Sequence, residues 1–200
     1  GDIWYNNGKF YLGTSQSFPG VWSSGGNLAT AREQLAGAGT QSAGLCMGGN
    51  SGSQSNVTEE YNGTSWSSGG NLATARERLA GAGTQSAGLV MGGEPPGLTS
   101  TEEYNGTSWS SGGNLGTGRY ALAGAGTQSA GLCMGGTTGS QSNVTEEYDG
   151  TSWSSGGNLA TARSFLPGAG TQSAGLCMGG TDGSNSNVTE EYDGTSWSSG

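Results

Sequence analysis

The chain of 200 residues contains no histidine and only 6 lysine and arginine residues. Without histidine, Ser-His and Cys-His catalytic pairs and histidine-based metal centres are excluded. The glycine-rich phosphate-binding motif with its lysine is missing as well. We therefore expect no enzymatic activity, no cofactor and no metal site.

Positive charge and long apolar segments are also scarce. The 15 acidic residues outnumber the basic ones and give a net charge of −9, which argues against nucleic acid and anionic membranes as partners. No apolar run approaches the roughly 18 residues of a membrane span, so we expect no membrane insertion. The chain begins at Gly1 without a signal peptide, so we expect it to be processed or cut from a longer protein.

The three cysteines give no sign of disulfides. Cys46, Cys133 and Cys177 each stand in the sequence AGLCMGG, and Val90 fills the same place in another copy. A position that accepts Cys or Val behaves as a small buried apolar site. Equivalent positions in separate repeats are also too far apart to be bridged. We expect neither a disulfide nor a metal site from these thiols.

A repeat dominates what the sequence does contain. The dipeptide Trp-Ser recurs at intervals of 43 or 44 residues, at Trp22, Trp66, Trp109, Trp153 and Trp197. A repeat of this length is too small to bury its own apolar face and must stack with its neighbours. The 43 glycines recur at fixed places beside Leu, Met, Tyr and Trp, which favours ordered β-structure over a flexible linker.

Each unit is predicted to contain four short strands. In the copy that ends at Arg76 the first three strands cover 35–40, 43–47 and 56–61, and the fourth strand begins at Trp66. Asn62-Gly63 is a hairpin signal between the third and the fourth strand. Four antiparallel strands in each period are typical of a β-propeller blade. We expect the glycine-alanine strand to be innermost, where blades crowd together and side chains must be small.

Two alternatives explain the pattern less well. The stretch NLATAREQLAGAG has helix-forming residues, but each glycine costs about 0.5–1 kcal/mol in a helix. Its apolar residues also keep no helical stripe past those glycines. A parallel β-helix would have shorter coils and no Asn-Gly hairpin signal in each repeat.

The repeat resembles the kelch unit over residues 22–200. Each copy has a double glycine after an apolar strand, a Tyr five residues before its Trp, and an Arg ten residues after Trp, at Arg32, Arg76, Arg119 and Arg163. The short Tyr–Trp interval departs from the family pattern and implies a tight turn. The resemblance implies a propeller but not one function, because kelch proteins include binding scaffolds and an oxidase.

The first 20 residues differ from the repeats. They contain a predicted hairpin around Asn7-Gly8, and GDIWYNNGKFYLG resembles a segment of bacteriophage tail-fibre proteins. We therefore divide the chain into a hairpin segment, 1–20, and a propeller, 21–200. We favour four regular blades, with the hairpin and Val21 to Ser23 forming an atypical fifth blade. The hairpin could instead cap or extend the ring.

Acidic pairs and aromatic residues recur in every unit and are interpreted as structural. Adjacent strand residues face opposite sides, so the carboxylates of Glu59 and Glu60 should diverge. We expect Glu59 to meet the arginine of its repeat in a partly buried bidentate pair. The recurrent tryptophans are expected to pack between blades rather than to stack on sugars, at Trp66, Trp109, Trp153 and Trp197.

The units differ mainly in two places. One is the loop after the double glycine, at 50–53, 94–98, 137–140 and 181–184, and the other is the pair after the arginine. In a four-stranded meander both segments lie on one rim, which fits a binding surface there. Equally, these loops could be merely the least constrained. The candidate ligand contacts are Tyr120, Phe165, Arg78, Glu94 and Leu98.

These observations favour a non-enzymatic propeller that acts in adhesion or receptor binding. The phage resemblance places it outside the cell or on a virion, and its partner is then a host-cell surface glycan or protein. The alternative is a structural subunit that assembles with its own copies or with other virion or filament subunits through an exposed strand edge.

Overall fold

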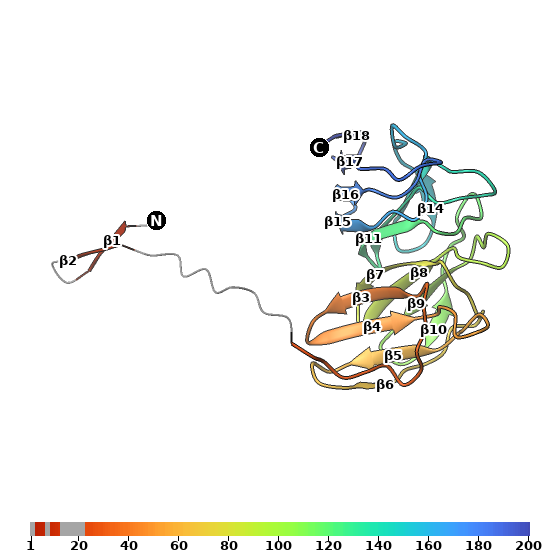
Figure 1. Ribbon diagram of the computed structural model, residues 1–200, viewed down its shortest axis with the longest axis horizontal. Coiled ribbons are helices and arrows are strands. Elements are labelled where there is room, and N and C mark those ends of the chain that lie inside the picture. Colours follow the sequence, from red (N-terminus) through yellow and green to blue (C-terminus); the bar gives the residue numbers. More distant parts are fainter. Residues whose placement is uncertain (1–2, 7–8, 13–22) are drawn as a thin grey trace.

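The computed structural model describes residues 3–6, 9–12 and 23–200 (Figure 1). All regular elements in these residues are β-strands, which confirms the all-β prediction, and no helix in them could cross a membrane. Sixteen strands form four antiparallel sheets of four strands each. Two further strands, β1 (Ile3–Asn6) and β2 (Lys9–Leu12), pair with each other.

Each sheet is a meander of consecutive strands. Sheet 1 contains β3 (Ala36–Thr40), β4 (Ala43–Met47), β5 (Thr58–Tyr61) and β6 (Trp66–Ser68). Sheet 2 contains β7 (Ala80–Thr84), β8 (Ala87–Met91), β9 (Thr101–Tyr104) and β10 (Trp109–Ser111). Sheet 3 contains β11 (Ala123–Thr127), β12 (Ala130–Met134), β13 (Thr145–Tyr148) and β14 (Trp153–Ser155). Sheet 4 contains β15 (Gly168–Thr171), β16 (Ala174–Met178), β17 (Thr189–Tyr192) and β18 (Trp197–Ser199).

The predicted four strands per unit are confirmed, with small shifts in their ends. The third strand begins at Thr58 rather than at residue 56. In sheet 4 the innermost strand begins at Gly168, after Pro167, which lacks the N–H that a ladder requires. The N-terminal hairpin pairs with no other described strand, so it is a separate two-stranded sheet rather than part of a fifth four-stranded one. Val21 and Trp22, assigned to that fifth blade, lie outside the described residues.

The turn between the third and fourth strands is a four-residue loop, not a two-residue hairpin. Tyr61 pairs with Trp66, and the side-chain oxygen of Asn62 accepts hydrogen bonds from the backbone N–H groups of Thr64 and Ser65 at 3.0 and 2.9 Å. Gly63 takes a φ of 90°, a conformation that favours glycine. The recurring Asn/Asp-Gly-Thr-Ser sequence therefore encodes a side-chain-capped turn.

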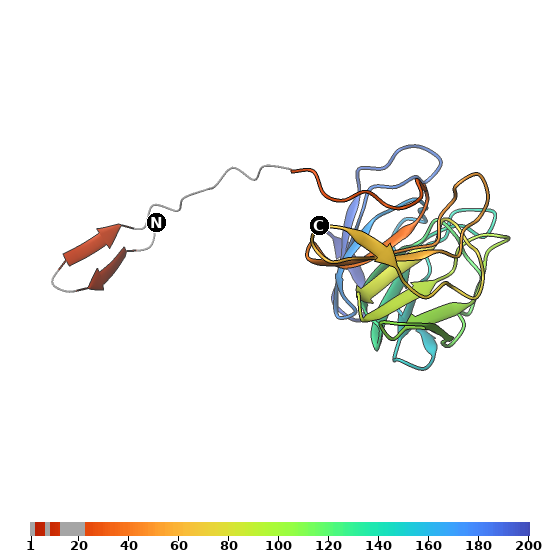
Figure 2. The same cartoon turned by 90° about the horizontal axis from the view of Figure 1, so that it is seen from below.

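The glycine-alanine strands lie at the inner edges of the sheets and next to one another, with sheets 1 and 4 at the two ends of the series (Figures 1 and 2). A Cβ on Gly81 would lie 3.0 Å from the carbonyl oxygen of Gly37, and one on Gly124 would lie 2.8 Å from that of Gly81. The neighbouring backbones thus leave no room for side chains at these positions. This close approach is the reason for the glycine content of the inner strands.

A buried arginine joins each sheet to the segment that precedes it. The Nη2 atom of Arg76 lies 2.5 Å from Oε1 of Glu102, and its Nη1 atom donates to the carbonyls of Gly92 and Ser100. The second carboxylate oxygen of Glu102 accepts the backbone N–H of Ala73 at 2.7 Å. The expected arginine–glutamate contact is present in all four units, as Arg32–Glu59, Arg76–Glu102, Arg119–Glu146 and Arg163–Glu190.

The prediction of a partly buried, bidentate pair is wrong in both respects. The arginine side chains are fully buried, and only one nitrogen–oxygen contact forms in each pair. The geometry is monodentate because the other carboxylate oxygen and the other guanidinium nitrogen are taken by backbone groups. Each arginine thus binds one carbonyl of the double glycine and adds a second donor to a carbonyl that already accepts a backbone N–H, as Gly92 and Ser100 show for Arg76.

The position that holds cysteine in three units and valine in one takes part in hydrogen bonding, which the sequence did not indicate. All three thiols are free and buried, and burial raises the pKa of Cys133 to about 11. Its protonated sulfur accepts a hydrogen bond from Nη2 of Arg119 at 3.3 Å. Where Val90 replaces the cysteine, Nη2 of Arg76 donates instead to Oγ of Ser100 at 3.0 Å. Ser100 stands where the other units have valine, so the two substitutions compensate each other.

Successive sheets pack face to face through the same set of contacts. We call the face of a sheet that contacts the following sheet its onward face, and the face that contacts the preceding sheet its incoming face. From sheet 1, Glu60 accepts the Tyr104 hydroxyl at 2.5 Å and Thr58 Oγ1 accepts Trp109 Nε1 at 2.9 Å. Gln85 Nε2 donates to two carbonyls of sheet 1. The same hydrogen bonds recur between sheets 2 and 3 and between sheets 3 and 4. As expected, the two carboxylates of a pair diverge, because Glu59 binds Arg32 while Glu60 binds the next sheet.

Replacing Arg76 with alanine should lower the free energy of unfolding by about 3–5 kcal/mol, because Glu102 and the carbonyl of Gly92 lose their partner and the carbonyl of Ser100 loses one of its two donors. Thermal and denaturant unfolding would measure the loss. Arg78→Ala, on a partly exposed side chain, is the matched control and should change stability by about 0–1 kcal/mol. Equal stability of the two variants would contradict a structural role for the buried arginine.

Stability should also fall between about pH 10 and pH 12. Burial and the hydrogen bond to Glu103 raise the pKa of Tyr148 to about 12, and burial with Glu147 does the same for Tyr192. A pKa raised on folding contributes stability that is complete below the unfolded value and is lost as pH rises through the folded one. Phenolate absorbance together with unfolding curves would follow this, and Tyr148→Phe should show a weaker pH dependence. A pH-independent stability in this window would be inconsistent with the tyrosine–glutamate contacts.

Candidate ligand site on the variable rim

The two variable segments of each unit lie side by side. Isolated antiparallel bridges join them in all four units, as Glu33 to Asn50, Glu77 to Glu94, Tyr120 to Thr137 and Ser164 to Thr181. This confirms that both sets of differences occupy the same rim. We call this surface, made of the residues after each arginine and after each double glycine, the variable rim.

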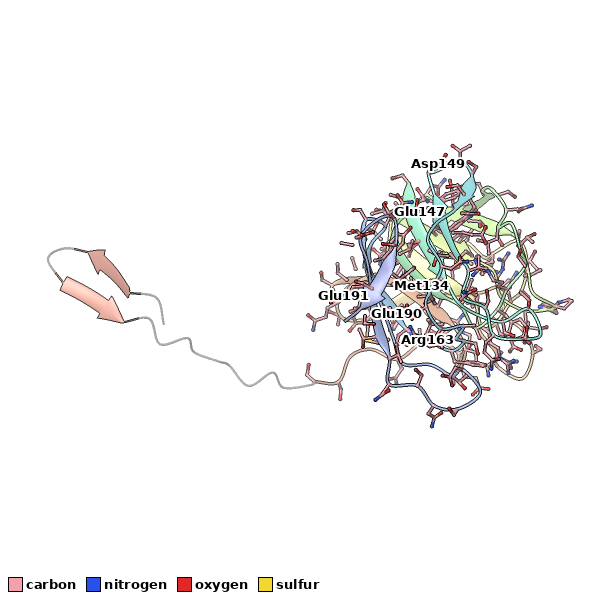
Figure 3. The ribbon with its side chains drawn as sticks, turned by 90° about the horizontal axis from the view of Figure 1, so that it is seen from above. Met134, Glu147, Asp149, Arg163, Glu190 and Glu191 are labelled. Atoms are coloured by element: carbon pink, nitrogen blue, oxygen red, sulfur yellow. The ribbon has the colours of Figure 1, made fainter. Side chains whose placement is uncertain are left out.

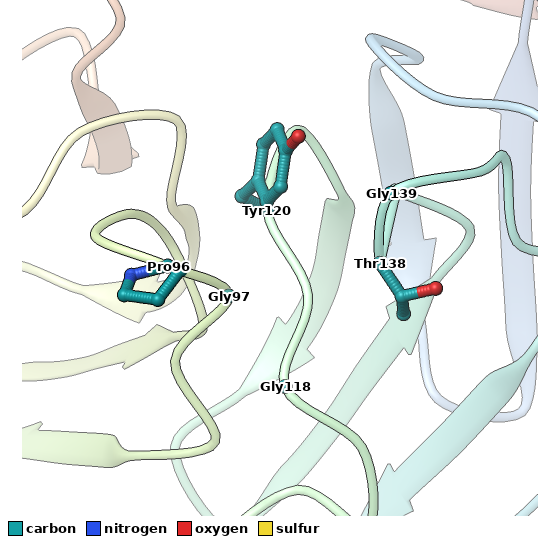
Figure 4. Close-up of a pocket in the computed structure, with 6 residues that line it drawn as sticks. All are labelled: Pro96, Gly97, Gly118, Tyr120, Thr138 and Gly139. Carbon is teal, nitrogen blue, oxygen red and sulfur yellow. The ribbon is translucent and has the colours of Figure 1, made fainter.

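The rim is hollowed where the second and third units meet. A cavity of about 370 Å³ is lined by Pro96, Gly97, Gly118, Tyr120, Thr138 and Gly139. Figure 4 shows Tyr120 between the loop of Pro96 and Gly97 on one side and Thr138 with Gly139 on the other. We call this cavity the rim hollow. Its volume lies within the range of small-molecule sites.

Several departures from the repeat meet in the rim hollow. Gly118 stands where the other units have Ala31, Ala75 and Ala162. A Cβ at this position would overlap the carbonyl oxygen of Gly97, so the loop with Pro95 and Pro96 reaches its place only because residue 118 is glycine. Tyr120, two residues further on, has no aromatic counterpart in the other units. A depression of about 430 Å³ lies at the equivalent place of the first unit, lined by Ala31, Arg32, Glu33, Asn50, Ser51 and Gly52. The rim hollow therefore differs from it in its lining, through Tyr120 and the loop of Pro96 and Gly97, and not in its place within the unit.

Leu98 fixes the end of this loop through its backbone. Its N–H donates to the carbonyl of Gly93 at 2.8 Å, and its carbonyl accepts the N–H of Arg119 at 3.3 Å. The loop is thus tied to the double glycine of its own sheet and to the arginine of the next. Leu98 supports the wall of the hollow and does not line it.

The chemistry of the rim hollow is neutral. Its lining offers one aromatic ring, one proline ring, the hydroxyls of Tyr120 and Thr138, and the backbone of three glycines. No carboxylate, ammonium or guanidinium group is among these residues. A partner with an apolar ring face and uncharged hydroxyl groups matches such a lining, since aromatic rings present an apolar face and a polar edge.

A second, smaller depression gathers the residues that follow each arginine. Its volume is about 170 Å³, and it is lined by Gln34, Leu35, Arg78, Leu79, Ala121, Leu122 and Phe165. The backbone N–H of Arg78 donates to Gln34, that of Ala121 to Arg78, and that of Phe165 to Ala121, each at 2.8 Å. The four units thus converge here in chain order.

Arg78 is held on three sides in this second depression. Its Nε atom donates to Oε1 of Gln34 at 3.0 Å, and its Nη1 atom lies 3.3 Å from Oε1 of Glu94. The guanidinium carbon stands 5.7 Å from the ring centre of Phe165, a cation–π distance. These contacts occupy Arg78 within the chain, while 57% of Phe165 is exposed.

The five predicted contacts therefore do not form one site. Tyr120 lines the rim hollow, Arg78 and Phe165 line the second depression, Glu94 pairs with Arg78, and Leu98 anchors a loop. Of the other residues that line the rim hollow, Pro96, Gly97, Thr138 and Gly139 lie in the variable loops predicted for the rim, and only Gly118 lies outside the predicted segments. A signal for the site was present in NLGTGRY of the third copy, which departs from NLATAR of the others.

The remaining chemistry of the repeat is structural in the described residues. Each recurrent Tyr–Trp pair packs ring against ring, with centroids 4.8 or 4.9 Å apart. In residues 3–6, 9–12 and 23–200 no group of three or more Cys, Asp and Glu side chains is arranged to hold a metal ion.

No protein-family model matches this chain, and no curated protein matches it either. The kelch resemblance therefore stays a proposal.

Replacing Gly118 with alanine should displace the loop of Pro96 and Gly97 and destabilise the protein by about 1–3 kcal/mol, because the new methyl group overlaps a backbone carbonyl. Gly116→Ala is the matched control, since it restores the residue found in the other three units. Unfolding curves and protease susceptibility of the loop would measure both effects. If the two variants behave alike, Gly118 does not shape the rim hollow.

Proposed function

We propose that the chain forms four blades of a kelch-like β-propeller and acts as a non-enzymatic binding module through its variable rim. The propeller is supported by the four meander sheets, by the close contacts of consecutive inner strands, and by the hydrogen bonds that run from unit to unit around the second depression. The constant core and the variable rim fit a scaffold that carries one specialised surface.

The rim hollow is the proposed binding site, and a neutral saccharide is the proposed ligand. The observation that carries this is the meeting of three unit-specific features, Pro96-Gly97, Gly118 and Tyr120, in one cavity of about 370 Å³. A sugar presents apolar C–H groups to an aromatic ring and hydroxyls to Thr138 and to the backbone. Among the lining residues, Tyr120 alone has an ionisable side chain, and none carries a carboxylate or an amine that could take part in catalysis.

Adhesion to a cell-surface glycan is the setting that these properties support. The opening segment GDIWYNNGKFYLG resembles part of phage tail-fibre proteins, which is the reason for proposing an extracellular or virion location. The negative net charge fits a neutral ligand better than an acidic one.

A glycan array tests this proposal directly. The protein should bind a subset of neutral glycans, and Tyr120→Ala should weaken that binding by about tenfold or more, since aromatic contacts dominate such sites. Phe165→Ala is the matched control, because it removes an exposed aromatic ring of the rim outside the hollow.

Two outcomes would count against the proposal. Binding that survives Tyr120→Ala but is lost in Phe165→Ala would move the site to the second depression. Absence of binding to any glycan on the array would overturn the choice of ligand class.

A further inference from the structure

The contacts that join the sheets leave one face open at each end of the series. Sheet 4 presents the onward residues Leu176, Thr189 and Glu191, and no hydrogen bond from another sheet reaches these side chains within residues 23–200. Glu191 is exposed and Leu176 is partly exposed, whereas the equivalent leucines are almost fully buried, at Leu45, Leu89 and Leu132. A depression of about 280 Å³ lies on this face, lined by Ala174, Gly175, Leu176, Glu191 and Tyr192.

Sheet 1 presents the matching incoming face at the other end. Its incoming residues are Gln41, Gly44, Tyr61 and Trp66, the equivalents of Gln85, Gly88, Tyr104 and Trp109. Gln41 is exposed and Tyr61 is partly exposed, while Tyr104, Tyr148 and Tyr192 are buried. No hydrogen bond from Gln41 Nε2 or from the Tyr61 hydroxyl to another sheet is present in residues 23–200.

The two open faces are the halves of an interface that the chain already forms three times. In each internal copy a glutamate accepts a tyrosine hydroxyl at 2.5 or 2.6 Å, and a threonine accepts a tryptophan Nε1 at 2.9 Å. In each copy a leucine of the onward face lies against a glycine of the incoming face. A Cβ on Gly88, Gly131 or Gly175 would lie 2.6 Å from that leucine. The open faces carry the same residue types in the same strands.

Within one chain the two faces do not meet. Figure 1 shows sheets 1 and 4 extending in opposite directions from the inner strands, with the outer strands β6 and β18 far apart. In Figure 3, Glu191 lies at the edge of the body, while Glu190 and Arg163 lie further in. Within residues 23–200, no tyrosine therefore donates to Glu191 as Tyr104 donates to Glu60.

We propose that the onward face of sheet 4 binds the incoming face of sheet 1 of a second copy of this chain. Glu191 then accepts the hydroxyl of Tyr61, Thr189 accepts Nε1 of Trp66, and Leu176 packs on Gly44. Gln41 donates to the carbonyls of Gly175 and Tyr192, as Gln85 does to Gly44 and Tyr61. The contact is head-to-tail, so it closes into a ring or continues as a filament. It does not depend on the ligand of the rim hollow.

One short segment must be displaced when two copies associate. By the repeat, Ser23, Ser24 and Gly25 of the copy that offers sheet 1 correspond to Ser198, Ser199 and Gly200 of the copy that offers sheet 4. Gly25 already lies beside the Tyr61 hydroxyl of its own chain, as Gly69 lies beside that of Tyr104. Ser23 and Ser24 are exposed and belong to no strand, whereas β18 is paired with β17, so residues 23–25 are the ones displaced.

Gly44→Ala blocks the incoming face without disturbing its own sheet. A Cβ at Gly44 has neighbours in its own chain at 3.4 Å or more, which is ordinary contact, while the internal equivalents have a leucine of the neighbouring sheet at 2.6 Å. The methyl group should weaken association by at least about tenfold. Leu176→Arg blocks the onward face, and its charge lies beside Glu191 on the same strand pair. Glu191→Ala is a milder second variant of that face.

Mixing the two blocked variants tests the direction of the contact. In sedimentation velocity the unmodified protein should form species larger than a monomer as its concentration rises, and each variant alone should stay monomeric. An equimolar mixture of Gly44→Ala and Leu176→Arg should give a heterodimer that grows no further, because one intact face of each kind remains. Gly116→Ala, an equally small change on the rim, should assemble like the unmodified protein.

A strictly monomeric unmodified protein at all concentrations would overturn the proposal and point to closure within one chain. Variants that assemble alone, or a mixture that stays monomeric, would also overturn it, because both results exclude a head-to-tail contact between these faces. Circular dichroism and melting temperature of each variant establish that it is folded before its assembly is interpreted. Failure of Leu176→Arg to fold leaves the mixing test to Glu191→Ala.

Discussion

The buried arginine of each unit is the contact on which the other contacts depend. Arg119 reaches the carbonyls of Gly135 and Val144, the sulfur of Cys133 and the carboxylate of Glu146 from one fully buried side chain. The N–H groups of Gly135 and Gly136 donate to the carbonyls of Val144 and Arg163, and the guanidinium of Arg119 supplies the donor to the carbonyl of Gly135. The charge is tolerated because Glu146 neutralises it and also accepts a backbone N–H.

This anchoring explains why the units differ mainly on the rim. The arginine side chain binds the carbonyls and the glutamate of its own sheet, whereas the two variable segments are joined to each other by one isolated bridge in each unit. Substitutions there leave the inner strands and the arginine unchanged. Even in the core, a change is accepted when its partner changes too, as Val90 and Ser100 show. Specialisation at the rim hollow and assembly through the end faces thus use different parts of the unit.

Much of the fold was predictable, and the site was predictable only in part. The four strands, the diverging acidic pair and the shared rim follow from local pattern and from the alternation of strand residues. The monodentate geometry of the arginine was not predictable, because it depends on carbonyls of a loop some 16 to 25 residues away. Tyr120 was predicted as a contact and the loops of Pro96 and Thr138 as parts of the rim, but their meeting in one hollow was not predictable, since its walls come from Pro96, Gly118 and Thr138 in two different units.

The sequence by itself determined the unit: its period, its strands, its side-chain-capped turn and the pairing of one arginine with one glutamate. These depend on neighbours in the chain or on a repeat spacing that is legible without coordinates. The tertiary structure alone decided which unit-specific residues share a cavity and which faces are left open at the ends of the series. Both depend on distances between units. The sequence around Leu132 and the sequence around Leu176 are the same, yet a neighbouring unit buries Leu132 and none buries Leu176, so the sequence alone does not distinguish the two.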